Sequence, residues 1–460
     1  MRLLTLFIFI LALYCTACKD NSSVGENSEA RLFFSTDSVL FDTIFTDKGS
    51  TTRTIKVFNY NKHKILINEL ALSGGNTSSF KININGLTTN TLSNIEIAGN
   101  DSIYVFVKAF IDPNSSDSPF LIEDSLLMTY NGRMQKLPLV AYGQNAVYMS
   151  DEKINTNITF QKGKPYVFYG NNTVTNGTVL SLDPGVRMFF HKKAKLTING
   201  SLQANGSLND SITFASDRME RIYRDEPGQW EGLHFTSRSK DNHLNFCIIK
   251  NALTGIQVDS LSSNNNTKLL ITNSIIKNHQ VAGIIANNGE ITGINNLIFN
   301  CGQFLLSLSN GGKFQFYQNT FAGYNFSMSR NTAAIFISNS SLSGNNTLDL
   351  SANFINNIIW GNNRNEIELK KTEEKLFDVE FKSNLIKTDT PDQIQGNNNV
   401  FNIDPLFINP RYDIFQLSHE SAFLKYGENI NIPKFNTFIM KDLKGIDRLF
   451  PSTLGCFQKN

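Results

Sequence analysis

The sequence contains few of the residues on which metal sites, disulfide frameworks and sugar platforms are often built. Among 460 residues there are five cysteines, six histidines and two tryptophans. Cys247, Cys301 and Cys456 are an odd set with wide spacing, which argues against a disulfide framework and indicates small buried apolar side chains. Because no HxxxH spacing occurs, we expect no metal and no cofactor.

The chain also lacks an excess of charge of either sign. It has 42 lysines and arginines against 40 aspartates and glutamates, and no long run of one sign interrupts it. A nucleic-acid partner is therefore not predicted. After residue 14, no apolar stretch is long enough to span a bilayer.

A short apolar segment at the N-terminus ends in small residues before a cysteine. Arg2 precedes an apolar run over residues 3–14, and a Thr-Ala-Cys string ending at Cys18 follows. This pattern resembles a bacterial lipoprotein signal, with one departure, because Cys15 stands where such signals usually have leucine. The resemblance implies removal of residues 1–17, acyl chains on Cys18, the membrane as a partner, and an outer-membrane location facing outward or into the periplasm. The alternative is an ordinary secretory signal.

Two different patterns follow the signal. Residues 18–30 are small, polar and free of aromatic side chains, so they predict a flexible tether. Over residues 31–145, apolar and polar residues alternate with period two, as in residues 80–84 and 103–107, and turn clusters separate the short runs. This pattern predicts an antiparallel β-sandwich. It resembles an immunoglobulin-like domain of the abnormal-spindle/hydin type, which implies a spacer or interaction module.

The second half of the chain carries a degenerate repeat of the form Asn-Ile-Ile-x-Asn. Its second apolar residue falls at positions 249, 276, 298, 321, 359 and 386. Such spacing is typical of the coils of a parallel β-helix, with an insertion in the longest interval. Apolar columns would point inward, asparagines would turn the backbone through the left-handed region, and stacked asparagines could bond one coil to the next.

Both ends of the repeat region resemble pectin-lyase-like β-helix proteins. The matching strings lie at residues 179–186, 196–206, 228–233 and 404–407. The resemblance covers residues 150–460 and implies a right-handed parallel β-helix with a capping segment from about residue 398. We therefore predict an all-β chain, in which an Ig-like β-sandwich is followed by this β-helix.

One stretch of the predicted β-helix combines charged and aromatic residues at high density. It runs from Arg218 to Trp230 and predicts an ion-paired loop that leaves the stack. The alternative is a glycan-binding groove formed by Arg221, Tyr223, Arg224 and Trp230. In such a groove the rings would stack on sugars and the guanidinium groups would donate hydrogen bonds.

Acidic residues are sparse between residues 251 and 363, the middle of the repeat. Asp259, Glu290 and Asp349 are the only ones there, and their spacing does not match one position on successive coils. A hydrolase needs grouped carboxylates, and a calcium-dependent lyase needs acidic ligands with a base. We therefore predict no catalytic residues.

These patterns together favour a lipid-anchored envelope protein that is not an enzyme. Its β-helix would bind a polysaccharide or another envelope component. The alternatives are a polysaccharide lyase or glycoside hydrolase with a divergent site, and a purely architectural envelope protein. The sequence leaves the oligomeric state open.

Overall fold

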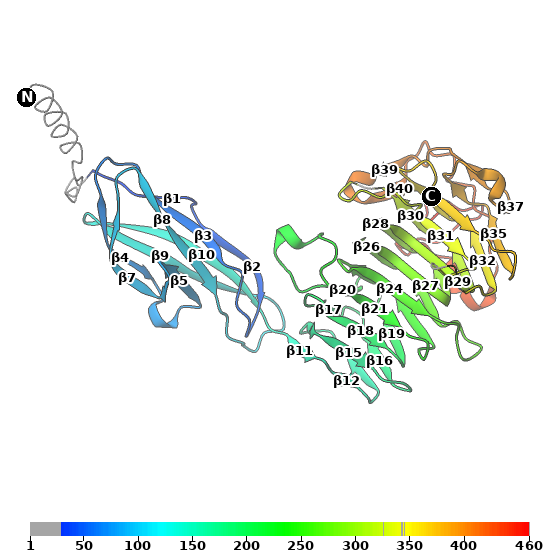
Figure 1. The fold of residues 1–460 in the computed structure, drawn as a ribbon, viewed down its shortest axis with the longest axis horizontal. Coiled ribbons are helices and arrows are strands. Elements are labelled where there is room, and N and C mark those ends of the chain that lie inside the picture. Colours follow the sequence, from blue (N-terminus) through cyan, green and yellow to red (C-terminus); the bar gives the residue numbers. More distant parts are fainter. Residues whose placement is uncertain (1–28, 325, 342–343, 345, 460) are drawn as a thin grey trace, which may run out of the picture. The chain divides into compact units, whose positions relative to one another are not determined.

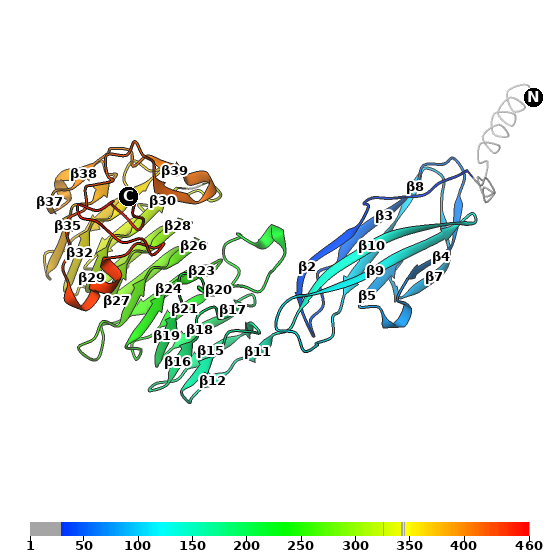
Figure 2. The same cartoon turned by 180° about the vertical axis from the view of Figure 1, so that it is seen from behind.

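A computed structural model describes residues 29–324, 326–341, 344 and 346–459 (Figures 1 and 2). Contacts divide the chain into two compact units, residues 1–145 and 146–460. The predicted signal, Cys18 and most of the tether lie outside the described residues. Within the described part, no helix is long and apolar enough to cross a bilayer.

The first unit consists of two five-stranded sheets. One has the strand order β1-β3-β8-β5-β6 and the other β2-β10-β9-β4-β7. Only β2 and β10 pair in parallel, and the other pairings in this unit are antiparallel. The strands are β1 (Phe33–Phe34), β2 (Val39–Phe45), β3 (Arg53–Asn59), β4 (Ile65–Leu72), β5 (Phe80–Ile84), β6 (Leu87–Thr89), β7 (Thr91–Ile97), β8 (Asp101–Ala109), β9 (Phe120–Tyr130) and β10 (Arg133–Gln144).

The period-two pattern explains how these two sheets pack. In β8, Val105, Val107 and Ala109 are buried, whereas the residues between them are exposed. Alternate residues of both sheets meet in one apolar core, which includes Ile55 and Leu126. The unit is therefore a β-sandwich, as its alternation predicted.

The second unit is a parallel β-helix with three walls, here named A, B and C (Figures 1 and 2). Wall A consists of β11 (Val147–Ser150), β14 (Tyr166–Tyr169), β17 (Arg187–Phe190), β20 (Ile212–Ser216), β23 (Cys247–Lys250), β26 (Ile275–His279), β28 (Leu297–Cys301), β30 (Thr320–Gly323), β33 (Ile358–Gly361), β36 (Leu385–Ile386) and β38 (Val400–Phe401). Wall B consists of β12 (Lys153–Ile154), β15 (Asn171–Val174), β18 (Lys195–Ile198), β21 (Gly232–Phe235), β24 (Thr254–Asp259), β27 (Ala282–Ile294), β29 (Phe304–Tyr317), β31 (Ile335–Ser338) and β34 (Ile367–Lys370). Wall C consists of β13 (Ile158–Phe160), β16 (Val179–Leu182), β19 (Ser201–Asn205), β22 (Asn242–Asn245), β25 (Leu269–Thr272), β32 (Leu350–Ile355), β35 (Phe377–Lys382), β37 (Gly396–Asn397) and the second halves of β27 and β29.

The repeat found in the sequence forms one column of wall A. Ile249 pairs with Ile276, Ile276 with Ile298, and Ile298 with Phe321 on successive coils. Phe321 then pairs with Ile359 across the long interval. All these side chains are buried in the same core. The predicted all-β fold class, with a parallel β-helix in the second half of the chain, is confirmed.

Asparagines stabilise one corner of the coils through a ladder of side-chain amides. The Oδ1 atom of Asn357 accepts hydrogen bonds from the backbone N of Asn319 (2.8 Å) and from its Nδ2 atom (3.0 Å). Asn384 accepts the same pair of bonds from Asn357. The residue just before each ladder asparagine turns through the left-handed region, with φ of 56° at Asn295 and 59° at Asn356. The predicted ladder and left-handed asparagine turns are both present.

The C-terminal segment, which we expected to cap the open end, covers the outer side of the stack over several coils. It contains the hairpin β39 (Phe407–Asn409) and β40 (Ile414–Leu417), and the short helix α2 (Asn436–Ile439). Its apolar residues pack on outward side chains of wall A such as Leu297, Phe299 and Trp360. The segment lies there because these outward residues are apolar and would otherwise face water.

Candidate functional site

The outer face of wall A carries a column of residues whose positions alternate along each strand with the residues that point into the core. Lys250 pairs with Lys277, Lys277 with Phe299, and Phe299 with Ala322 on successive coils. Burial lowers the pKa of Lys250, whose ammonium donates a hydrogen bond to the Arg224 carbonyl (3.1 Å). Further along the wall, the column is open to a groove.

The groove lies between two segments that are far apart in the sequence. One bank is the loop over residues 217–229, which contains the 3-10 turn η2 (Arg221–Tyr223), and the other contains η4 (Pro410–Tyr412). The volume is about 470 Å³. The lining residues are Arg221, Ile222, Asp225, Glu226, Asn278, Phe299, Asn300, Tyr324, Phe326, Ser327, Pro410, Arg411, Tyr412, Asp413 and Phe415. We refer to it as the wall A groove.

An ion-pair network connects the two banks of the wall A groove. The Lys277 Nζ atom lies 2.9 Å from Asp413 Oδ2 and 3.9 Å from Asp225 Oδ1. The same ammonium lies 5.3 Å from the centroid of the Phe299 ring. One lysine on the coil therefore holds a carboxylate from each bank.

The rim of the wall A groove is aromatic and exposed. Tyr412 is 74% exposed and Phe326 is 51% exposed. Phe326 stacks on Tyr324 with 5.6 Å between the ring centroids, and Arg411 lies over it at 5.8 Å. Burial raises the pKa of Tyr324 well above its usual range. Exposed rings beside guanidinium groups are suited to stacking on a sugar and bonding its hydroxyls.

The loop over residues 217–229 is ion-paired, as its sequence predicted. Arg218 and Glu220 form a salt bridge at 3.0 Å, which raises the pKa of the guanidinium. The same guanidinium carbon lies 3.7 Å from the centroid of the Tyr223 ring and covers one of its faces. Arg221 lines the wall A groove, whereas Tyr223 and Arg224 do not.

The position of Trp230 corrects the predicted glycan site. This side chain is 1% exposed and lies inside the β-helix, stacked on Phe190 at 4.1 Å between centroids. Its indole N–H donates to the Lys250 carbonyl (2.8 Å). Trp230 faces inward because it pairs in parallel with Ala252 of the next coil, which is itself buried. A buried indole cannot stack on an external sugar.

Most of the wall A groove was missed in the sequence. Phe326, Tyr412 and Asp413 lie about one hundred residues or more from the loop that contains Arg221. No local motif marks them, because these residues reach the groove only through the path of the folded chain.

Two other groups of titratable residues lie on the β-helix. On wall B, His234 Nε2 is 2.6 Å from Asp259 Oδ2. Burial would raise the pKa of Asp259, but hydrogen bonds from His234 and Gln257 lower it below its usual value. Burial also lowers the pKa of Lys268 to about 8, although Asp259 and Glu290 oppose the shift. The Lys268 ammonium donates hydrogen bonds to the backbone carbonyl groups of residues 237 and 261. It therefore connects the loop that follows β21 with the loop that follows β24.

The second group is a column of three residues at the ends of wall A strands, where Tyr169 ends β14 and His191 and Asp217 directly follow β17 and β20. His191 Nδ1 lies 2.7 Å from Asp217 Oδ2, and the His191 ring lies 4.8 Å from that of Tyr169. Burial raises the pKa of Asp217 and raises that of Tyr169 to about 12. Among the residues described, no group of three or more His, Cys, Asp or Glu side chains could hold a metal ion.

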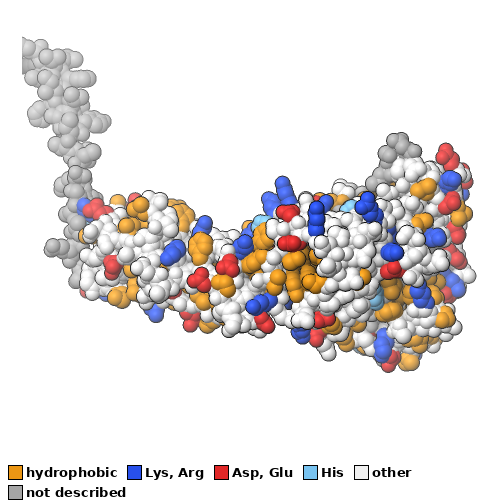
Figure 3. Space-filling model, turned by 90° about the horizontal axis from the view of Figure 1, so that it is seen from below, with side chains coloured by type: hydrophobic (Ala, Val, Ile, Leu, Met, Phe, Trp, Pro, Cys, Tyr) orange, Lys and Arg blue, Asp and Glu red, His pale blue; other side chains and the backbone are white. Residues whose placement is uncertain are grey.

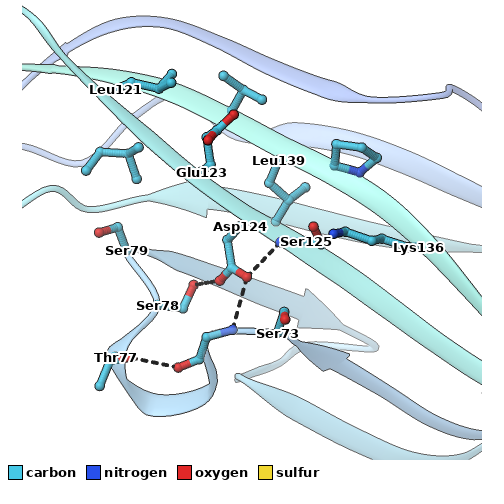
Figure 4. A pocket seen from close by; sticks show the side chains of 14 residues that line it. Ser73, Thr77, Ser78, Ser79, Leu121, Glu123, Asp124, Ser125, Lys136 and Leu139 are labelled. Atoms are coloured by element: carbon cyan, nitrogen blue, oxygen red, sulfur yellow. Dashed lines mark hydrogen bonds between the residues drawn. The ribbon is translucent and has the colours of Figure 1, made fainter.

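In the first unit, a hollow of about 740 Å³ surrounds Asp124 (Figure 4). The Asp124 carboxylate accepts hydrogen bonds from the backbone N of Gly74 (3.0 Å), the backbone N of Ser125 (2.6 Å) and the Ser78 hydroxyl. These bonds fix the turn between β4 and β5. The carboxylate is thus occupied in holding the fold.

Charges of both signs are interspersed over the face of the molecule shown in Figure 3. This distribution agrees with the near-zero balance of the sequence, a formal net charge of +2. It provides no extended field of one sign on that face.

Comparisons with known proteins identify no family. No family model matches the sequence, and no curated protein matches it. Among solved structures, pectate lyase Pel9A is 13% identical over 69% of this chain and 88% of its own, with a TM-score of 0.34. A family 123 glycoside hydrolase from Clostridium perfringens is 10% identical over 26% of each chain, with a TM-score of 0.19. The E. coli chaperone DraB is 9% identical over 25% of this chain and 55% of its own, with a TM-score of 0.18.

The chain therefore spans about a quarter of the hydrolase's length and about half of the chaperone's.

Proposed function

We propose that this chain is a lipid-anchored protein of the bacterial outer membrane whose β-helix binds a glycan in the wall A groove. The observation that carries the proposal is the exposed aromatic rim at Phe326 and Tyr412, held beside Arg221 and Arg411 above a wall of the coil. A groove of about 470 Å³ falls in the size range of sites for small ligands. The anchor would be Cys18, and the first unit would act as an Ig-like spacer or interaction module.

A polysaccharide array tests the proposal with the full chain and the double variant Phe326→Ala/Tyr412→Ala. We expect binding to at least one glycan, and we expect the double variant to weaken it at least tenfold, because both rings of the rim are lost. Leu376→Ala removes a similarly exposed apolar side chain from outside the groove and should leave binding unchanged. Absence of binding across the array, or equal binding by the double variant, would contradict the proposal.

The second candidate function is a polysaccharide lyase, and one observation favours it. The Lys277 ammonium lies between the carboxylates of Asp225 and Asp413, both of which line the wall A groove. An ammonium held between two carboxylates stays protonated, so it can stabilise the negative charge that develops when the proton next to a uronate carboxylate is removed. Formation of unsaturated uronate ends, followed by their ultraviolet absorbance and lost in Lys277→Met, would establish this function in place of simple binding.

A further inference from the structure

The first unit presents an open sheet face with an unusual composition. The outward positions of β3, β5 and β8 alternate with the buried core of the sandwich. Those positions are Thr54, Lys56, Phe58, Lys81, Asn83, Ser102, Tyr104, Phe106 and Lys108. Phe33 of β1 pairs with Phe58 and extends the surface at one edge, and Phe110 extends it beyond β8. We refer to this surface as the aromatic face.

The rings of the aromatic face form two groups in contact, with Tyr60 beside the first group and Phe110 beyond the second. At one end, Tyr60 stacks on Phe58 with centroids 5.3 Å apart and lies 5.7 Å from Phe33. In the middle, Tyr104 stacks on Phe106 at 6.2 Å. Tyr104 is 47% exposed, and Phe110 at the far end is 50% exposed. Exposed rings gathered on one face mark an interaction surface rather than the scattered apolar residues of an ordinary exterior.

Three lysines accompany the rings, and no carboxylate occupies the outward positions of these strands. Lys56 pairs across the sheet with Tyr104, and its ammonium lies 4.8 Å from the centre of that ring. Lys81 and Lys108 stand opposite each other on β5 and β8. Within the described residues, none of the three lysines forms an ion pair. The aromatic face therefore carries positive charge that the sheet itself does not neutralise.

A hollow of about 600 Å³ lies on this face. Phe106, Phe110, Lys81 and Lys108 line it together with hydroxyl and amide side chains. Its volume suits a few sugar units, and its lining combines ring faces, ammonium groups and neutral hydrogen-bonding groups.

We propose that the aromatic face binds an anionic polysaccharide. The rings offer surfaces on which sugar rings stack, and the lysines act as point charges for carboxylate or sulfate groups. Protein–protein interfaces are enriched in aromatic residues but depleted in lysine, so the three lysines argue against a protein partner. This site is separate from the wall A groove and does not depend on it.

Affinity electrophoresis with immobilised polymers tests this proposal separately from the proposed groove. The starting protein is the full chain with the groove substitutions Phe326→Ala/Tyr412→Ala, and the probes are polygalacturonate, dextran sulfate and neutral dextran. We expect at least one acidic polymer to retard this protein, with weaker retardation at high salt because the contacts are ionic. Dextran should have no such effect. Preference for polygalacturonate would indicate carboxylate recognition, and preference for dextran sulfate would indicate sulfate recognition.

Adding Phe106→Ala/Lys108→Gln should reduce this affinity at least tenfold. The matched control is Met134→Ala/Lys136→Gln, which removes an exposed apolar residue and an exposed lysine from the other sheet of the sandwich. Thermal unfolding of both variants confirms that the sandwich stays folded. The proposal is overturned if neither acidic polymer binds, if both pairs of substitutions have the same effect, or if sedimentation shows that Phe106 instead mediates association between copies of the chain.

Discussion

Single buried polar residues in the β-helix are held by partners that fix their protonation state. The His279 side chain is fully buried, and its Nδ1 atom accepts a hydrogen bond from the backbone N of Ala252 (3.2 Å). Its Nε2 atom lies 3.2 Å from the Ile249 carbonyl, to which the neutral imidazole donates. Burial lowers the pKa of His279 to about 4. A second proton would have to enter at Nδ1, where an N–H group already points.

This environment predicts a stability loss in acid. The unfolded chain binds a proton at His279 below about pH 6.5, whereas the folded chain does so only near pH 4. The free energy of unfolding should therefore fall as the pH falls between these values, by about 3 kcal/mol from this residue. Denaturant unfolding of the wild type and of His279→Gln, at several pH values between 7 and 4, measures the difference between their free energies of unfolding.

We expect that difference to shrink by most of this amount on acidification, because glutamine does not titrate. His419→Gln replaces an exposed imidazole and serves as the control for the loss of a histidine. A constant difference for His279→Gln would contradict this account of the buried imidazole.

Trp230 shows what residue type alone cannot predict. The charged loop before it made a surface position plausible, but the chain re-enters the coil at Trp230 in register with Ala252. A shift of one residue in a strand moves a side chain from one face to the other. The length of the loop does not fix that register, so the sequence could not decide whether the indole faced a ligand or the core.

At the scale of the coil, stacking depends on the asparagine ladder as well as on the apolar columns. Asn357 is fully buried, and its Nδ2 atom also donates to the Phe316 carbonyl (2.9 Å). It therefore satisfies backbone groups on neighbouring coils, which have no access to water. Removing the amide leaves those groups without partners, at a cost that a new apolar contact does not offset.

We expect Asn357→Leu to lower the free energy of unfolding by about 3 kcal/mol, since several buried hydrogen bonds are lost together. Asn353 lies on β32 with its side chain outward, and Asn353→Leu should change the stability by less than about 0.5 kcal/mol. Chemical denaturation followed by circular dichroism compares the two variants. Equal effects would show that the hydrogen bonds of the ladder asparagine contribute no more to stability than the side chain of an outward asparagine.

The sequence predicted this element well for a physical reason. Each coil repeats the same constraints, so the inward column through Ile276 and the turn asparagines recur at readable intervals. The packing of the C-terminal segment was harder to predict from the sequence. Its contacts involve outward residues such as Trp360 and Phe415, whose apolar character is visible in the sequence but whose partners are not.

At the scale of the whole chain, the candidate site depends on distant segments that the coils bring together. Lys277 on β26 holds Asp225 from one bank and Asp413 from the other. Of the predicted glycan residues, Arg221 reaches the wall A groove, and Trp230 belongs to the core. Local patterns in the sequence could identify the loop but not its opposite bank, because that bank is set by the return path of the C-terminal segment.

Hydrogen–deuterium exchange of the full chain, with and without a glycan that it binds, tests the central claim most directly. Because ligand contact protects backbone amides around the groove, we expect slower exchange in residues 221–226, 299–300 and 410–415, with little change on walls B and C. Protection confined to wall B at His234 and Asp259, or an unchanged exchange pattern at saturating glycan, would contradict the assignment of the wall A groove as the binding site.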